Sequence, residues 1–122
     1  MTKLNNLPHG CDTEKKMLPF KRRLMAGLVK PVRSSAYLTW VKSLPCCGCG
    51  APADDPHHII DVGLGGGMGT KPSDFPYTIP LCRPCHTLLH ADVDEWEDAN
   101  GSQALLALLT VHQALDEGII DL

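Results

Sequence analysis

Four of the six cysteines form two Cys-x-x-Cys pairs, which constrain the fold more than any other feature of this sequence. The pairs are separated by 32 residues and consist of Cys46 with Cys49 and of Cys82 with Cys85. Two such pairs can place four thiolates tetrahedrally around Zn²⁺, at about 2.3 Å from the metal. Gly48 and Gly50 suit a sharp turn in the first pair and let backbone amides approach the sulfurs. We therefore predict a structural zinc site rather than a disulfide framework.

The composition predicts a small apolar core. The 122 residues include 11 Gly and 10 Pro but only two Trp, two Tyr and two Phe, so a metal would help this loop-rich chain to fold. No apolar run approaches the roughly 18 residues that span a bilayer. The apolar stretch 24–29 is too short for a signal peptide and lacks a small-residue cleavage site. We expect a soluble, cytoplasmic protein.

The net charge of −3 is unevenly distributed along the chain. Residues 1–42 carry nine Lys or Arg against two acidic residues, whereas residues 43–122 carry two against twelve. Residues 1–33 are therefore interpreted as a basic N-terminal arm, which either grips phosphates or is a solvated leader. The overall pI of about 6.0 argues against strong, indiscriminate binding of nucleic acid.

Two short apolar runs between the cysteine pairs predict a β-hairpin. Residues 57–62 and 77–81 are the predicted strands, and the Gly-, Pro-, Ser- and Asp-rich segment 63–76 is the predicted loop. Pro80 restricts the second strand to a sheet edge. Pro84 fits the first turn of a helix that follows the hairpin directly.

Helices are predicted on both sides of this hairpin. The first begins at Ser34 or Ser35 and runs to about Ser43, with an apolar stripe of Tyr37, Leu38, Val41 and Leu44. A short acidic helical turn is predicted around Trp96, and a last helix from the cap Ser102 to Gly118. The buried stripe expected for this last helix is Leu105, Leu108, Leu109, His112 and Leu115.

Four histidines lie between or just after the cysteine pairs. His86 and His90 are four residues apart on a predicted helix, so they share one face and can chelate one ion. His57 and His58 come from the first predicted strand, which zinc would clamp against that helix. Phosphodiester hydrolysis needs a base to deprotonate water and a cation to stabilise the departing oxygen. A histidine pair alone is often a surface feature, but its combination with both cysteine pairs favours a functional metal site.

The linked motifs resemble the HNH (ββα-metal) endonuclease family, and most closely its phage- and prophage-encoded members, which include recombination-enhancement nucleases. The resemblance covers about residues 35–91. It rests on Cys46-x-x-Cys49, His57-His58-Ile59-Ile60, Gly67-Met68-Gly69-Thr70-Lys71, Asp74, Ile79-Pro80-Leu81-Cys82, Cys85-His86 and His90.

The resemblance implies a role for each matching histidine. His57, His86 and His90 correspond to ligands of a catalytic Mg²⁺ or another divalent ion, and His58 corresponds to the general base. The family's middle asparagine is missing, because its usual position falls on Tyr77. Asp74 is the candidate replacement, whose carboxylate either orients His58 or pairs with the backbone to fix the loop.

Two further features bear on this resemblance. Consecutive residues of a regular strand point to opposite faces, so His57 and His58 need a bulge or a strand end to face one ion. The glycine-rich segment 63–71 lacks the Gly-Lys-Ser/Thr ending of a phosphate-binding loop and is interpreted as a connection between strands. Lys71 and Arg83 remain the candidate contacts with the DNA backbone.

The sequence thus predicts an α+β fold, with a small zinc-stapled ββα-metal core and flanking helices in residues 34–122. The expected function is a metal-dependent HNH endonuclease of low sequence specificity and of phage or prophage origin. Its expected partners are DNA and a recombination or other DNA-processing protein. The alternative is a zinc-stabilised module that binds DNA or protein without catalysis.

Overall fold

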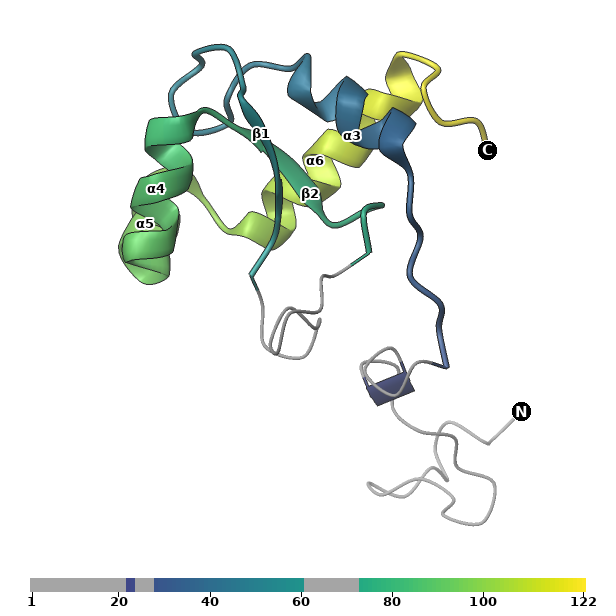
Figure 1. The fold of residues 1–122 in the computed structure, drawn as a ribbon, viewed down its shortest axis with the longest axis horizontal. Coiled ribbons are helices and arrows are strands. Elements are labelled where there is room, and N and C mark those ends of the chain that lie inside the picture. The colour runs from purple at the N-terminus through teal and green to yellow at the C-terminus, as the bar shows by residue number, and fades with distance from the viewer. Residues whose placement is uncertain (1–21, 24–27, 61–72) are drawn as a thin grey trace, which may run out of the picture.

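The computed structural model describes residues 22–23, 28–60 and 73–122. Along the chain its elements are α3 (Ser35–Lys42), β1 (Asp55–His58), β2 (Thr78–Leu81), α4 (Arg83–Ala91), α5 (Val93–Asn100) and α6 (Gln103–Asp116). The predicted α+β class is confirmed (Figure 1). No helix within the described ranges is long and apolar enough to cross a bilayer.

The sheet consists of β1 and β2, which pair antiparallel with His57 opposite Ile79 and His58 opposite Thr78. The second strand was predicted nearly to the residue, but the first lies two residues earlier than predicted and is shorter. Ile59 N–H still donates to Tyr77 O at 2.9 Å, whereas both backbone groups of Ile60 bond to a side chain of α6. The strand ends because those groups are used elsewhere.

Local signals set the boundaries of the helices. The Ser34 side chain accepts from Tyr37 N–H at 3.1 Å and caps α3, as predicted. The Ser102 side chain accepts from Leu105 N–H at 3.0 Å and caps α6 in the same way. Pro84 lies in the first turn of α4, where its missing N–H has no helical partner to lose.

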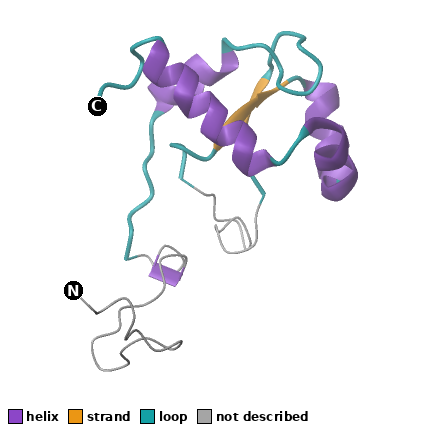
Figure 2. Ribbon diagram, turned by 180° about the vertical axis from the view of Figure 1, so that it is seen from behind, coloured by secondary structure: helices purple, strands orange, loops and turns teal. Residues whose placement is uncertain are grey.

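Helix α6 crosses one face of the hairpin, as the view from behind shows (Figure 2). The predicted stripe of this helix is wrong: Leu105, Leu108 and Leu109 are 52%, 64% and 52% exposed, His112 is exposed and Leu115 is half-buried. The buried side is Gln103, Ala107, Thr110 and Ala114. Both sets of residues recur at helical spacing, so periodicity alone does not distinguish them. The side with small residues is buried because it lets α6 pack closely against the hairpin and α3.

Two apolar clusters hold the elements together. The larger one includes Ile79 and Leu81 of β2, Leu89 of α4 and Trp96 of α5, all 4% exposed or less. In the smaller one, Tyr37 and Val41 of α3 pack with Ala114 of α6. The predicted stripe of α3 is therefore largely confirmed, with Leu44 buried and Leu38 half-buried.

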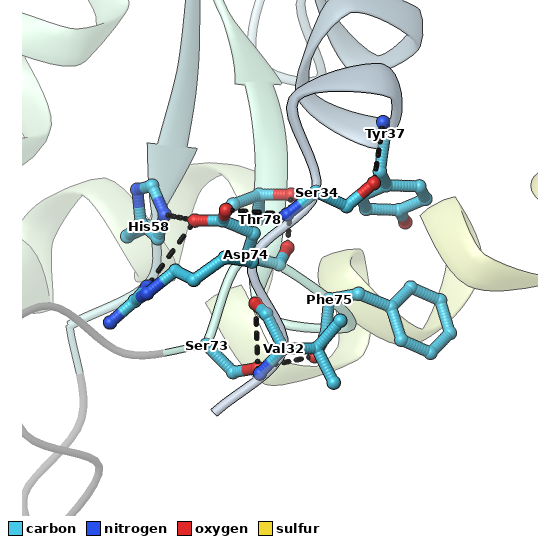
Figure 3. A network of polar contacts seen from close by, with 9 residues as sticks. Val32, Ser34, Tyr37, His58, Ser73, Asp74, Phe75 and Thr78 are labelled. Atoms are coloured by element: carbon cyan, nitrogen blue, oxygen red, sulfur yellow. Dashed lines mark hydrogen bonds and ion pairs between the residues drawn. The ribbon is translucent and has the colours of Figure 1, made fainter. Parts of the chain in front are cut away.

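The last residues of the predicted arm pair with the domain. Val32 forms an isolated antiparallel bridge with Phe75, and its N–H donates to the Ser73 hydroxyl (Figure 3). Arg33 lies 3.4 Å from an Asp74 oxygen. Residues 1–21 and 24–27, which make up most of the arm, lie outside the described residues.

Candidate metal centres

The four paired cysteines come together as their spacing predicts. The sulfurs of Cys46, Cys49, Cys82 and Cys85 all lie within 4.8 Å of one another. Those of Cys49 and Cys82 are 3.5 Å apart. A tetrahedral zinc with bonds of about 2.3 Å places its sulfurs about 3.8 Å apart, so this cluster can bind a metal such as zinc.

The turn of the first pair is shaped to fit these sulfurs. Gly48 N–H donates to Cys46 Sγ at 3.3 Å, and Gly50 has a φ of +82°, which favours glycine. A Cβ on Gly48 would lie 3.0 Å from Cys85 Sγ. Burial of Cys46 raises its pKa, but hydrogen bonds from backbone groups outweigh that effect and lower the pKa to about 7. A lowered pKa favours the thiolate, which is the form of cysteine that binds a metal.

Cys47 lies outside the quartet of sulfurs. It is half-buried, and its pKa is raised to about 12, first by burial and then by the neighbouring Cys46. Its sulfur is not among the four that converge, so Cys47 is not part of this candidate metal site. Cys11 lies outside the described residues.

Three histidines form a second cluster, between β1 and α4. His86 Nε2 lies 3.0 Å from His57 Nδ1 and 3.1 Å from His90 Nε2, and the three nitrogens lie within 4.8 Å of one another. With metal–nitrogen bonds of about 2.1 Å, adjacent ligands are about 3.0 Å apart in an octahedron and about 3.4 Å apart in a tetrahedron. The spacing suits three ligands of a single ion.

The outer nitrogens of two of these rings have partners that orient them. His86 Nδ1 lies 2.9 Å from a carboxylate oxygen of Asp55, and His57 Nε2 lies 2.9 Å from the amide oxygen of Gln103. Both partners accept, so both outer nitrogens carry the proton and both inner nitrogens present lone pairs. Lone pairs facing each other at 3.0 Å repel unless a cation lies between them, so the residues present fit a metal ion.

Burial keeps His57 in this neutral form. The ring is 2% exposed, and its pKa is lowered to about 4, first by desolvation and further by electrostatic repulsion from the neighbouring imidazoles of His86 and His90. The bond with Gln103 acts in the opposite direction but is outweighed. A neutral imidazole at pH 7 is the form that ligates a metal.

His58 points to a different partner from that of His57. Its Nε2 lies 2.6 Å from Asp74 Oδ1 (Figure 3), so the role of proton acceptor falls to Nδ1. The alternation along β1 therefore holds, and the two adjacent histidines serve separate networks.

Asp74 combines both roles that were considered for it. Besides meeting His58, its Oδ2 accepts from Ser34 N–H at 2.9 Å, and Arg33 lies at 3.4 Å from Oδ1. Burial raises the pKa of Asp74, but the bonds with His58 and Ser34 N–H outweigh it and hold the pKa below its usual range. The carboxylate therefore orients His58 and also ties the loop to the start of α3.

Of the two predicted DNA contacts, Arg83 and Lys71, the structure describes only Arg83. Arg83 forms a two-pronged pair with Asp55, at 3.0 and 3.2 Å, although its side chain stays 71% exposed. This pair, followed by the bond with His86, holds the pKa of Asp55 below its usual range. Lys71 and the glycine-rich segment 63–71 lie outside the described residues. A DNA contact by Arg83 or Lys71 stays a prediction.

Asp55 and Gln103 are the site residues that the sequence did not indicate. Asp55 stands just before the predicted strand 57–62 and was given no role. Gln103 follows His57 by 46 residues and lies in a different element, so no spacing rule connects the two. The available signal was a polar residue on the side of α6 opposite its leucines.

Comparison with known proteins gives a family and one curated relative. A family model described as a protein of unknown function (DUF968) matches residues 27–118. The uncharacterized protein YdfU of Escherichia coli (strain K12) is 49% identical over 84 residues, which cover 69% of this chain and 24% of that protein. The chain thus spans about a quarter of the length of this relative. No solved structure matched the chain. The chain belongs to the DUF968 family of proteins of unknown function.

Proposed function

We propose that this protein is a metal-dependent endonuclease of the HNH type, in which β1, β2 and α4 form the ββα-metal core. The observation that carries the proposal is the convergence of three imidazole nitrogens from β1 and α4, beside a fourth histidine paired with a buried carboxylate. Ligands and base in this arrangement supply what phosphodiester hydrolysis requires.

His57, His86 and His90 would hold a divalent ion such as Mg²⁺. When bound, the ion would polarise a phosphate oxygen and stabilise the charge on the departing oxygen. Asp55 keeps the His86 ring in the tautomer that binding needs. Three protein ligands leave positions for phosphate and water on an octahedral ion.

His58 would act as the general base through Nδ1. Asp74 keeps the proton on Nε2, so the Nδ1 lone pair can accept a proton from water. The carboxylate also stabilises the imidazolium that results, as acidic partners of catalytic histidines do. From the resemblance, the products would be a 5′-phosphate and a 3′-hydroxyl.

The four cysteines would bind zinc in a structural role. Cys85 and His86 are adjacent at the start of α4, so one helical turn anchors the thiolate cluster and presents a ligand of the imidazole cluster. Arg83 in the same turn is exposed, and it pairs with Asp55, which also contacts the His86 ring. Arg83 would contact a phosphate, and Lys71 and the basic arm are the other proposed contacts with DNA.

A plasmid-nicking assay with His58→Ala tests this function. The full chain is incubated with supercoiled DNA and Mg²⁺ or Mn²⁺, and His112→Ala, which changes an exposed histidine on α6, serves as the matched control. Wild type and the control should nick alike, and His58→Ala should be slower by about 10²–10⁴-fold.

Two outcomes would contradict the proposal. Unchanged nicking by His58→Ala refutes the assignment of the base. Binding of DNA without nicking under any divalent ion supports the alternative, a zinc-stabilised binding module.

A further inference from the structure

The amide of Gln103 is held in one orientation. Gln103 is the first residue of α6 and only 1% exposed, and the Ser102 cap fixes where the helix begins. Its Oε1 accepts from Ile60 N–H at 3.0 Å, while its Nε2 donates to Ile60 O at 3.1 Å and lies 3.3 Å from a carboxylate oxygen of Glu97. If the amide were flipped, its NH₂ group would face the donor Ile60 N–H, and its oxygen would face two acceptors, Ile60 O and the Glu97 carboxylate.

This orientation determines where the proton of His57 lies. Gln103 Oε1 can only accept, so His57 Nε2, 2.9 Å away, must donate. The Nδ1 lone pair then faces His86 Nε2 at 3.0 Å. In the other tautomer, Nδ1–H would donate to His86 Nε2, and the bond between the two rings would occupy both ligand positions.

We propose that Gln103 is a positioning residue that fixes the metal-binding tautomer of His57. The inference rests on the proposed role of His57 as a ligand of the divalent ion. It makes α6, which lies outside the ββα core, a required part of the site. Glu97 of α5 acts indirectly, through Gln103. Its carboxylate also accepts from the Gln103 backbone N–H at 2.9 Å, which helps to hold the side-chain amide in place.

The tautomer of His57 can be measured directly by ¹⁵N-histidine NMR on the full chain, after a mild EDTA treatment that leaves the thiolate-bound metal in place. Wild type should show His57 protonated at Nε2. Gln103→Met removes the acceptor at similar length and should move the proton to Nδ1 or to a mixture of both nitrogens. Its affinity for Mn²⁺, followed by EPR, should fall about 10–100-fold. Mn²⁺ prefers nitrogen and oxygen ligands and so does not replace the metal on the thiolates.

Two variants separate positioning from packing. Thr110→Val alters the same buried side of α6, but its hydroxyl donates only to Leu106 O, so tautomer and Mn²⁺ affinity should stay as in wild type. The double variant Glu97→Gln/Gln103→Glu keeps an acceptor for His57 and for Ile60 N–H and should restore the Nε2 proton, although its stability should fall because Ile60 O loses its donor.

A wild-type His57 protonated at Nδ1 would overturn the inference, and this measurement does not depend on any variant folding. A folded Gln103→Met with wild-type tautomer and Mn²⁺ affinity would overturn it as well. Failure of the nuclease proposal looks different, because DNA would stay intact while the Nε2 proton and Mn²⁺ binding remained.

Discussion

Replacing Asp74 by asparagine removes one acceptor from a carboxylate that uses both of its oxygens. Oδ1 meets His58 Nε2 at 2.6 Å, and Oδ2 accepts from Ser34 N–H at 2.9 Å (Figure 3). The residue is only 6% exposed, so water cannot readily replace a lost partner. An asparagine has one acceptor oxygen, so its NH₂ group must face either Ser34 N–H or His58 Nε2.

The two orientations differ in cost. With NH₂ toward Ser34, two donors face each other and the Ser34 N–H loses its acceptor, which lowers the free energy of unfolding by about 1–3 kcal/mol. With NH₂ toward His58, the ring can accept at Nε2 by moving its proton to Nδ1, which costs little because both tautomers are neutral. We expect the second orientation, in which Nδ1 can no longer accept a proton. Nicking should therefore fall about 10²–10⁴-fold, while the free energy of unfolding falls by only about 1 kcal/mol.

Thr78→Val is the matched control for this variant. Thr78 is fully buried, and its hydroxyl donates to the backbone oxygen of Asp74 at 3.1 Å, so the change affects the same loop but not the carboxylate. It should lower the free energy of unfolding by about 1 kcal/mol, measured in urea, and leave nicking within a few-fold of wild type. An Asp74→Asn variant that nicks at the wild-type rate would refute the proposed link between this carboxylate and the base.

The same variant changes the acid stability in a predictable direction. Because the pKa of folded Asp74 lies below its unfolded value of about 3.9, its stabilising contribution is present above that pH and is lost as the pH falls through the lower, folded pKa. Asp74→Asn lacks this contribution, so the difference in unfolding free energy from wild type should shrink below about pH 4. A difference that stays constant down to pH 2 would contradict the depressed pKa.

Three further predictions concern the metal frame and the core. Removing the thiolate-bound metal with a strong chelator should unfold the hairpin and α4, seen as loss of helical circular dichroism that Zn²⁺ restores; an unchanged spectrum would exclude a structural role. Gly48→Ala places a Cβ 3.0 Å from Cys85 Sγ and 3.2 Å from Trp96, and should lower stability by about 1–3 kcal/mol together with zinc affinity. Gly50→Ala is the control: it should lower stability by about 1–2 kcal/mol because its φ is +82°, but it should keep its zinc affinity. If both variants lost zinc affinity equally in a competition assay, the steric argument for Gly48 would be contradicted. Leu89→Ala in the core should lower the free energy of unfolding in urea by about 2–5 kcal/mol, whereas Leu108→Ala on the exposed side of α6 should change it by less than about 0.5 kcal/mol. Similar losses in the two variants would indicate that the leucine side of α6 is buried after all.

Short-range spacing rules account for the parts that the sequence predicted. Local turn geometry brings the sulfurs of two cysteines three residues apart close together, and the helical period places His86 and His90 on one helix face. The caps Ser34 and Ser102 likewise act within one turn. Each of these rules involves a few neighbouring residues, so no knowledge of the tertiary fold is needed to apply it.

Long-range packing accounts for what the sequence did not predict. Helix α6 has two faces with the same periodicity, and hydrophobicity favoured the leucines. The hairpin and α3 instead contact the side with Gln103, Ala107 and Ala114, because close approach requires small residues and Gln103 satisfies Ile60 and His57. A buried glutamine is favourable only where its partners are already in place, which sequence periodicity does not reveal.

One short strand carries two adjacent histidines, His57 and His58, for which different chemical roles are proposed. Alternation along β1 sends His57 toward α4 and Gln103, and sends His58 toward Asp74 in the loop before β2. A bulge that turned both rings to one ion would take His58 away from Asp74 and leave the proposed base without the carboxylate that orients it. The regular strand keeps the proposed ligand and the proposed base adjacent in sequence and gives each ring its own acceptor, so the tautomer of each can be fixed independently. Inserting one residue between them would place both rings on the same face of the strand, and should abolish nicking while Mn²⁺ still binds His57, His86 and His90.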